Sequence, residues 1–496
     1  MRHVMPSADH ALKIAIDRHE AAPIYLQICE RFKTAIAAGH LKPGDRVPAL
    51  RGLATQLNIA RGTVETAYTI LVDEGYLQMR GAAGTFVSSS LPEAATPSGA
   101  RKDRERGNAP RTARATRAEP AAEIGHDAKP LRPGLPALDA FPRKVWSRLV
   151  AHRARSGDLA TLAYPDPAGY RPLRERIATY LGLSRGVACD PQQVFVTNGY
   201  RATLELVLRG LAKPEDRAWF EEPGYLLARN FLLDAGMRLV PVPTDDEGLD
   251  VDAGIALAAD ARFAFVTPAH QSPLGVTLSL ARRMKLLDWA SRAQGWIVED
   301  DYDSEFRYAG RPLPALKSLD RDDRVIYCGT FSKVLFPGLR LSYVVAPGRA
   351  VERFGQVTAS MNAGSPYLYQ AAVADFIAQG HFARHLKRMR ALYAQRREWL
   401  ATAIQKAFGD RVSIGLPTGG MHLVAIFRAD RDGPVDDLAM AARAREAGLA
   451  VLALSAWYLN GRSKETLRGI VVGFANVADA GEAARLARML RRAYDG

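Results

Sequence analysis

The sequence predicts an α/β chain in two parts: a small winged helix-turn-helix unit at the start and a large body with a mostly parallel sheet. Three amphipathic segments and two short strands around a glycine turn, within residues 24–87, predict the first part. Short apolar strands that alternate with helical stretches predict the second part, because this alternation is typical of a parallel sheet covered on both faces. At 496 residues, the chain is also longer than one hydrophobic core usually serves.

Apolar residues recur at helical spacing in three segments near the start. The first predicted helix places an apolar residue at every fourth position, from Ile24 to Ile36. Two further segments share an i, i+3, i+4, i+7 pattern, and only residues 58–63 separate them, which is short enough for a helix-turn-helix. These two sets are Leu50, Leu53, Ala54 and Leu57, then Val64, Ala67, Tyr68 and Leu71. Residues 76–80 and 85–87 are typical of two strands joined by a glycine turn, and they predict a wing.

The charge distribution favours a nucleic-acid partner for this unit. The chain has a net charge of +14, and residues 1–117 hold 17 Lys and Arg against 11 Asp and Glu. Phosphate backbones attract such surfaces, although charge alone leaves open a merely solvated basic surface. In a helix-turn-helix, the start of the third helix meets base edges in the major groove, while the second helix and the wing approach the backbone. The candidate DNA-binding residues are Arg51, Arg61, Thr63, Thr66, Arg80 and Gly81.

Composition changes after the wing. Residues 88–130 are rich in Ala, Pro, Arg and Ser, and Ile124 is their only β-branched aliphatic or aromatic residue. Such a segment cannot bury enough apolar surface to offset its ordering entropy. We therefore predict a DNA-binding unit over residues 1–87, a flexible linker over 88–130 and the body over 131–496.

Cysteine usage and hydropathy bear on the cellular compartment. Cys29, Cys189 and Cys328 are far apart and show neither a disulfide framework nor a metal-ligand spacing. The start has no uninterrupted apolar core typical of a signal peptide, and no run of about 18 apolar residues occurs. We expect a cytoplasmic protein with no membrane segment and no metal site.

In the body, clear strands are predicted over residues 194–197, 262–267, 296–300 and 325–328, with helices over 202–211 and 280–293. Lys333 follows the last of these strands, so it is expected beyond the carboxyl edge of the sheet, where ligands bind in α/β proteins. A shielded lysine amine can form a Schiff base with an aldehyde. Taken alone, a Ser-Lys pair is usually a surface lysine.

Further residues supply the other groups that one flat, phosphorylated cofactor needs. Asp300 ends a strand and can pair with a protonated ring nitrogen, and Tyr302 can hydrogen-bond a ring oxygen. Arg340 and Ser332 suit a phosphate, as does the strand-to-helix turn at Gly199, Tyr200 and Arg201. Tyr225 can stack on a ring, although core packing is the commoner role of a tyrosine.

The motifs of the first part resemble the GntR-type winged helix domain from Pro23 to Val87. The matching stretches are residues 23–25, 41–48, 53–54, 61–64, 67–68, 74–77 and 84–87. Ala49 and Ala60 stand where that family often has Ser, so a cap or phosphate hydrogen bond is expected to be missing at each.

The body resembles fold-type I aminotransferases over roughly residues 130–495. The matching stretches are residues 164–169, 197–199, 267–275, 299–302 and 332–340. Joined to the GntR-type start, the whole chain is similar to the MocR subfamily of transcription regulators. By that resemblance Lys333 carries pyridoxal phosphate, and the protein is a head-to-tail homodimer that binds promoter DNA.

Two departures from the aminotransferase pattern bear on activity. Val471 stands where an arginine usually binds the substrate carboxylate, and Arg468 is the nearest alternative. Ser272 stands where many aminotransferases have an Asn near the ring oxygen. Without the arginine, an amino-acid carboxylate loses a charge-assisted pair worth about 1.5–3 kcal/mol, which makes full transamination doubtful.

Three functions remain open from the sequence. The leading hypothesis is a regulator in which pyridoxal phosphate, or its exchange with an effector amine, shifts the conformation of the body and so changes DNA binding. The second is a working aminotransferase with an accessory DNA-binding unit. The third, a DNA-binding protein whose body has lost the cofactor, is least favoured because Asp300, Tyr302, Lys333 and Arg340 are all present. The operator, the effector and the direction of regulation are not determined.

Overall fold

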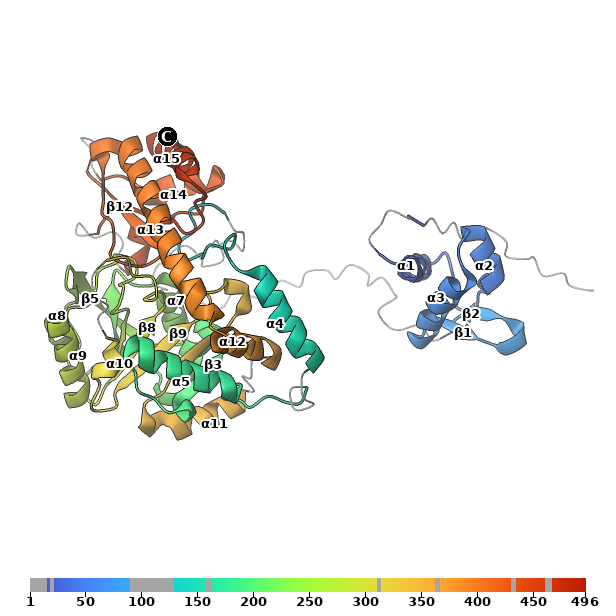
Figure 1. The fold of residues 1–496 in the computed structure, drawn as a ribbon, viewed down its shortest axis with the longest axis horizontal. Helices are drawn as coiled ribbons and strands as arrows, with labels where there is room; N and C mark the ends of the chain where they lie inside the picture. The colour runs from blue at the N-terminus through green and yellow to red at the C-terminus, as the bar shows by residue number, and fades with distance from the viewer. Residues whose placement is uncertain are drawn as a thin grey trace, which may run out of the picture. The chain divides into compact units, whose positions relative to one another are not determined.

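The computed structural model describes residues 16–17, 22–89, 129–156, 162–309, 314–361, 366–429, 434–459 and 466–496. The chain separates into two compact units, Met1–Arg114 and Ala115–Gly496 (Figure 1). Most of the predicted linker, residues 90–128, lies outside the described residues. The domain boundaries drawn from the sequence therefore stay predictions.

The small unit is a winged helix-turn-helix, as the sequence predicts. Its elements are α1 (Ile24–Ala37), α2 (Leu50–Leu57), α3 (Arg61–Asp73), β1 (Leu77–Met79), the 3-10 turn η1 (Gly81–Ala83) and β2 (Thr85–Val87). The residues that carry the helical periodicity meet in one core, where the rings of Phe32 and Tyr68 pack edge to face at 5.5 Å. β1 and β2 pair antiparallel, with Leu77 opposite Val87, and form the wing.

The large unit is built on an eight-stranded sheet in the order β3-β10-β9-β8-β7-β4-β5-β6. Strands β9, β8, β7, β4 and β5 run parallel, which confirms the predicted mostly parallel sheet. β10 lies antiparallel between β3 and β9, an insertion that the sequence analysis did not predict. The strands are β3 (Val194–Thr197), β4 (Arg217–Glu222), β5 (Arg238–Asp245), β6 (Gly248–Leu249), β7 (Phe263–Val266), β8 (Trp296–Asp301), β9 (Val325–Thr330) and β10 (Ser342–Val345).

Helices cover both faces of this sheet. Along β9, Tyr327 belongs to one hydrophobic cluster, whereas its neighbours Ile326 and Cys328 belong to another, so successive side chains enter two separate cores. α6 packs against β3, β9, β10 and α11, while α4 and α5 both pack against α12 (Figure 1). The helices are α4 (Arg143–Ser156), α5 (Arg171–Arg185), α6 (Tyr200–Leu211), α7 (Leu226–Asp234), α8 (Val251–Ala258), α9 (Leu280–Arg292), α10 (Leu316–Leu319), α11 (Val351–Met361), α12 (Tyr367–Ala378), α13 (His381–Phe408), α14 (Asp437–Glu446) and α15 (Ala480–Asp495).

A second, antiparallel sheet follows in the C-terminal part, in the order β11-β12-β14-β13. The long helix α13 packs against α15 and leads into this sheet (Figure 1). Its strands are β11 (Val412–Ile414), β12 (His422–Phe427), β13 (Leu452–Ala453) and β14 (Gly469–Gly473). The segment that precedes α4 contacts this sheet, because the Gly473 N–H donates to the Leu131 carbonyl at 2.8 Å. No helix in the part of the chain that the structure describes is both long and apolar enough to cross a membrane.

Candidate functional site

The carboxyl ends of β8 and β9 bring the predicted cofactor residues to one edge of the large sheet. These strands are parallel neighbours, with Asp300 opposite Cys328. Tyr302 directly follows β8, and Lys333 lies three residues beyond the end of β9. Since parallel strands end at the same edge, residues separated by about 30 positions in the chain become neighbours there.

Lys333 occupies a shielded position against the chain segment that precedes α4. Its Nζ donates a hydrogen bond to the Gly134 carbonyl at 2.9 Å. A Cβ at Gly134, where φ is +72°, would lie 2.5 Å from this nitrogen, so only glycine allows the approach. Burial lowers the pKa of Lys333 below its usual value, and the nearby carboxylates of Asp303 and Asp300 act against this shift. Such a lysine more readily presents the neutral amine that attacks an aldehyde.

Asp300 is only 8% exposed and accepts a hydrogen bond from the Tyr200 side chain. Burial raises the pKa of Asp300 to about 7, while Tyr200 and Lys333 act in the opposite direction. A buried carboxyl of this kind becomes fully ionised when a cation faces it. The phosphate cradle predicted at Tyr200 involves its backbone, and the structure shows in addition that its hydroxyl is directed to Asp300.

The start of α6 and Arg340 come together where a phosphate was predicted. Gly199 caps α6 with a φ of +88°, and a Cβ at this glycine would lie 3.1 Å from the Arg340 guanidinium carbon. The Arg340 side chain also donates to the Asn198 carbonyl at 3.4 Å. A guanidinium beside free N–H groups of a helix start suits an anion. Arg201, by contrast, is exposed, with its guanidinium 5.2 Å from the Phe231 ring centroid.

The remaining predicted residues flank this site. The Tyr225 ring centroid lies 6.1 Å from that of Tyr200 and 6.0 Å from that of Trp457. The side chain of Ser272, the residue that stands where many aminotransferases have an Asn, shares a hydrogen bond with that of Tyr302. Ser332 is half-buried, and its backbone N–H donates to the Thr330 hydroxyl at 3.1 Å.

A buried group of two histidines and an aspartate lies beside Tyr302. His270 Nδ1 is 2.9 Å from the Tyr302 hydroxyl and 3.3 Å from Asp303 Oδ1. His422 Nε2 donates to the Pro273 carbonyl at 2.8 Å, and burial together with the neighbouring His270 lowers the pKa of His422 to about 4. One nitrogen or oxygen atom from each of His270, Asp303 and His422 lies within 4.8 Å of the others.

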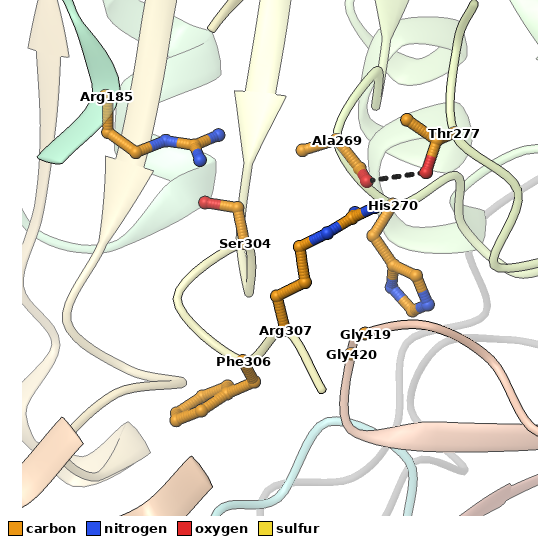
Figure 2. Close-up of a pocket in the computed structure, with 9 residues that line it drawn as sticks. All are labelled: Arg185, Ala269, His270, Thr277, Ser304, Phe306, Arg307, Gly419 and Gly420. Atoms are coloured by element: carbon orange, nitrogen blue, oxygen red, sulfur yellow. Dashed lines mark hydrogen bonds between the residues drawn. The ribbon is translucent and has the colours of Figure 1, made fainter. Parts of the chain in front are cut away.

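These three residues and Gly134 were not predicted as site residues. His270 occurs in the stretch 267–275 that carries the aminotransferase resemblance, and Asp303 directly follows Tyr302, so both offered a signal. Gly134 and His422 offered none, because their proximity to Lys333 and His270 is a tertiary effect. His270 also lines a small pocket with Ser304 and Arg307, in which the Thr277 hydroxyl donates to the Ala269 carbonyl at 3.3 Å (Figure 2).

The strand position expected to hold a carboxylate-binding arginine is apolar. Val471 on β14 is fully buried in a cluster with Leu454 and Trp457, and Tyr225 and Leu274 pack against this cluster. Arg468 does not substitute for the arginine, because its guanidinium pairs with buried Asp437 at 3.5 Å. Neither Val471 nor Arg468 therefore offers an unpaired cation at this strand.

The predicted DNA-binding residues lie on the exposed parts of the small unit. Arg51 is on α2, and Arg61 begins α3, with half-buried Thr63 in its first turn. The Thr66 hydroxyl donates to the Gly62 carbonyl of the same helix at 2.9 Å. Arg80 and Gly81 are exposed at the wing.

Neighbouring side chains shape this surface. The Arg80 guanidinium lies 5.0 Å from the Phe86 ring centroid. Arg46, to which sequence analysis assigned no role, lies against the wing, since a Cβ at Gly84 would be 3.1 Å from its Nε. Ala49 and Ala60 cap α2 and α3 without side-chain hydrogen bonds, as expected from the sequence.

Comparisons with known proteins match both units. Residues 24–87 match bacterial regulatory proteins of the gntR family, and residues 144–475, more than half of the chain, match aminotransferase class I and II. The chain is 41% identical to the probable rhizopine catabolism regulatory protein MocR of Rhizobium meliloti, over 84% of each chain. It is 33% identical to the HTH-type pyridoxine biosynthesis transcriptional regulator PdxR of Corynebacterium glutamicum, over 94% of this chain and 95% of that one.

A solved structure agrees with the second match. LysN, the α-aminoadipate aminotransferase of Thermus thermophilus complexed with N-(5'-phosphopyridoxyl)-L-leucine, is 29% identical, with a TM-score of 0.66 over 74% of this chain and 92% of its own. The winged start, the aminotransferase fold and the identity to full-length regulators all agree. The chain belongs to the MocR-like family of HTH-type transcriptional regulators, in which a GntR-type DNA-binding domain precedes an aminotransferase class I and II domain.

Proposed function

We propose that this protein is a pyridoxal-phosphate-dependent transcription regulator whose body binds the cofactor through Lys333 and senses an amine or the cofactor itself. The observation that carries the proposal is a shielded lysine of lowered pKa beside a buried carboxylate, in a chain that begins with a DNA-binding unit. An aminotransferase would not need a winged helix unit for catalysis. The second hypothesis, a working aminotransferase, is disfavoured by the apolar environment of Val471.

The residues of the site fit pyridoxal phosphate group by group. Lys333 would offer the amine that combines with the aldehyde, and Asp300 would hold the protonated ring nitrogen. Tyr302 and Ser272 lie together to hydrogen-bond the ring oxygen. Tyr225 would stack on the ring. The phosphate would be bound by Arg340, Ser332 and the N–H groups that follow Gly199. When bound, the cofactor supplies an electron-withdrawing ring and an aldehyde that combines with amines.

Tyr200 keeps the ring-nitrogen partner in its charged form. Its hydroxyl donates to Asp300, which favours the carboxylate over the carboxylic acid. Because this carboxylate is buried next to two further acids, Asp301 and Glu221, its charge is costly until a cation faces it. A protonated ring nitrogen is such a cation, so we propose that cofactor binding relieves the cost.

Relatives of this chain suggest two kinds of signal. The name of one relative refers to rhizopine catabolism and that of another to pyridoxine biosynthesis. In this chain the same site therefore suits either an amine that reacts beside Lys333 or the cofactor level itself. In both cases the ligand regulates only through different affinities for two conformations of the body.

Substitution of Arg61 by Ala tests the DNA-binding role. Arg61 is exposed at the first position of α3, where it can fork onto a guanine or a phosphate. We expect affinity for the DNA upstream of the protein's own gene to fall about 10- to 100-fold in a fluorescence anisotropy titration at fixed salt. Arg171→Ala is the control, because Arg171 is 78% exposed on α5 of the body and pairs with Glu175 four residues along the same helix. Unchanged affinity in Arg61→Ala, or no binding by the wild-type protein at any cofactor level, contradicts the proposal.

We further propose that the protein is a homodimer. Leu162 and Tyr164 are 83% and 95% exposed, and large apolar side chains so open to water are typical of a surface that another subunit covers. They lie in or beside the stretch 164–169 that carries the aminotransferase resemblance. Light scattering of the purified protein is expected to give the mass of two chains, or about 108 kDa from a chain mass of 54.1 kDa. A mass of one chain in the presence of cofactor contradicts this proposal.

A further inference from the structure

The apolar environment of Val471 raises the question of what receives the acidic group of an amino-acid effector. Val471 faces Leu454 and Trp457, and the alternative Arg468 is held by Asp437. An ionised carboxylate is costly to bury unless a cation or several hydrogen bonds face it. If the effector is an amino acid, another part of the chain must supply this cation. The inference that follows rests on the proposed function, namely that the body binds an amine beside Lys333.

The segment before α4 joins the end of β14 to Lys333. At one side, the Gly473 N–H donates to the Leu131 carbonyl at 2.8 Å, and a Cβ at Gly473 would lie 2.1 Å from the Arg132 carbonyl oxygen. At the other side, Gly134 accepts the hydrogen bond of Lys333 Nζ at 2.9 Å. Arg132 therefore lies between the strand that carries Val471 and the amine that anchors the cofactor.

The charge of Arg132 acts within the same site. The Arg132 cation shifts the pKa of Lys333 in the same direction as burial, against Asp303 and Asp300. Its charge also lowers the pKa of Tyr225, the ring assigned to stack on the cofactor, against the larger effect of burial. The other titratable groups here are Asp300 and Asp303, which favour the protonated lysine, and His422, whose pKa is lowered mainly by burial and by His270, with a smaller effect in the same direction from Lys333. The Arg132 charge therefore acts on both the lysine amine and the Tyr225 hydroxyl, and its backbone lies in the segment that contacts both Gly473 and Lys333.

We propose that Arg132 binds the carboxylate of an amino-acid effector, in place of the strand arginine that Val471 replaces. The effector's amine then lies next to Lys333, and its acidic group points toward the segment that precedes α4. The ligand class is an amino acid with one carboxylate, bound more tightly than the plain amine of the same carbon chain. Arg132 is a specificity-determining residue, and no bond to it forms or breaks.

Three small probes and two variants test this assignment. Alanine and 3-aminopropanoate both give ethylamine when the carboxylate is removed, so they report what the acidic group contributes at two positions. Each probe is titrated into the cofactor-loaded, full-length protein, and the change in the visible absorbance of the bound cofactor gives a dissociation constant. We expect at least one amino acid to bind about 10- to 100-fold more tightly than ethylamine, the range expected for one charge-assisted pair. Arg132→Gln is expected to remove this preference, and Arg132→Lys to retain part of it.

Arg282→Gln is the matched control, because Arg282 on α9 is also half-buried but pairs with Asp245 at the end of β5. This variant is expected to keep the full preference. The inference is overturned if the wild-type protein binds ethylamine as tightly as both amino acids, if no probe changes the absorbance, or if Arg132→Gln keeps the preference. A parallel titration with DNA separates this result from the proposed function, since loss of all cofactor-dependent DNA binding would refute the regulator role, whereas failure of the Arg132 variants alone refutes only this assignment.

Discussion

Lys333→Ala is expected to lose the visible absorbance of bound pyridoxal phosphate completely and to release the cofactor on desalting. The amine that can combine with the aldehyde beside Asp300 belongs to Lys333, whose burial lowers its pKa and so favours the reactive neutral form. The measurement is an absorbance spectrum of the protein before and after desalting. DNA affinity of the variant is also expected to become independent of added cofactor.

Two further variants show whether the amine itself is responsible. Lys333→Arg keeps a long cationic side chain but lacks a primary amine, so it is expected to lose the absorbance as well. Lys285→Ala removes a 56% exposed lysine that pairs with Asp252 on the surface, and it should leave the spectrum unchanged. If Lys333→Arg kept the wild-type spectrum after desalting, Lys333 would not be the attachment point.

Asp301→Ala is expected to lower the free energy of unfolding of the body by about 3–5 kcal/mol. The Asp301 carboxylate is 2.7 Å from the Arg185 guanidinium, with exposed side-chain fractions of 2% and 7%, and it accepts the Tyr327 hydroxyl at 2.6 Å. Its removal leaves a buried guanidinium without its counter-ion, and this cost exceeds the value of the pair itself. The difference in free energy of unfolding between variant and wild type is measured by urea denaturation of the cofactor-free protein, with circular dichroism as the signal.

Matched substitutions distinguish an ion-pair effect from a general loss of contacts. Asp252→Ala breaks a surface pair in which the carboxylate is 71% exposed, and we expect a change of no more than about 1 kcal/mol. In the double variant Arg185→Met, Asp301→Ala, much of the stability is expected to return, because no buried charge remains. A single variant Asp301→Ala as stable as the wild type would show that the pair contributes nothing to the body.

Local patterns in the sequence determined the elements and part of the site. The repeat of apolar residues from Ile24 to Leu71 specifies three helices because each residue's neighbours on a helix face are three or four positions away. The strands before Asp300 and Lys333 were recognisable as short apolar runs, and parallel strands with their carboxyl ends at one edge place the two residues together. The absence of the strand arginine at Val471 was also visible in the sequence.

The tertiary structure alone decided which distant residues complete the site. The insertion of β10, the second sheet, the Tyr200 hydrogen bond to Asp300, and the approach of Gly134 to Lys333 all join segments far apart in the chain. The contact between residues 134 and 333 spans 199 positions, and no periodicity in either segment encodes the other. Helix and strand patterns reflect interactions between near neighbours, whereas these contacts depend on how the sheet order and the return of the segment before α4 close the fold.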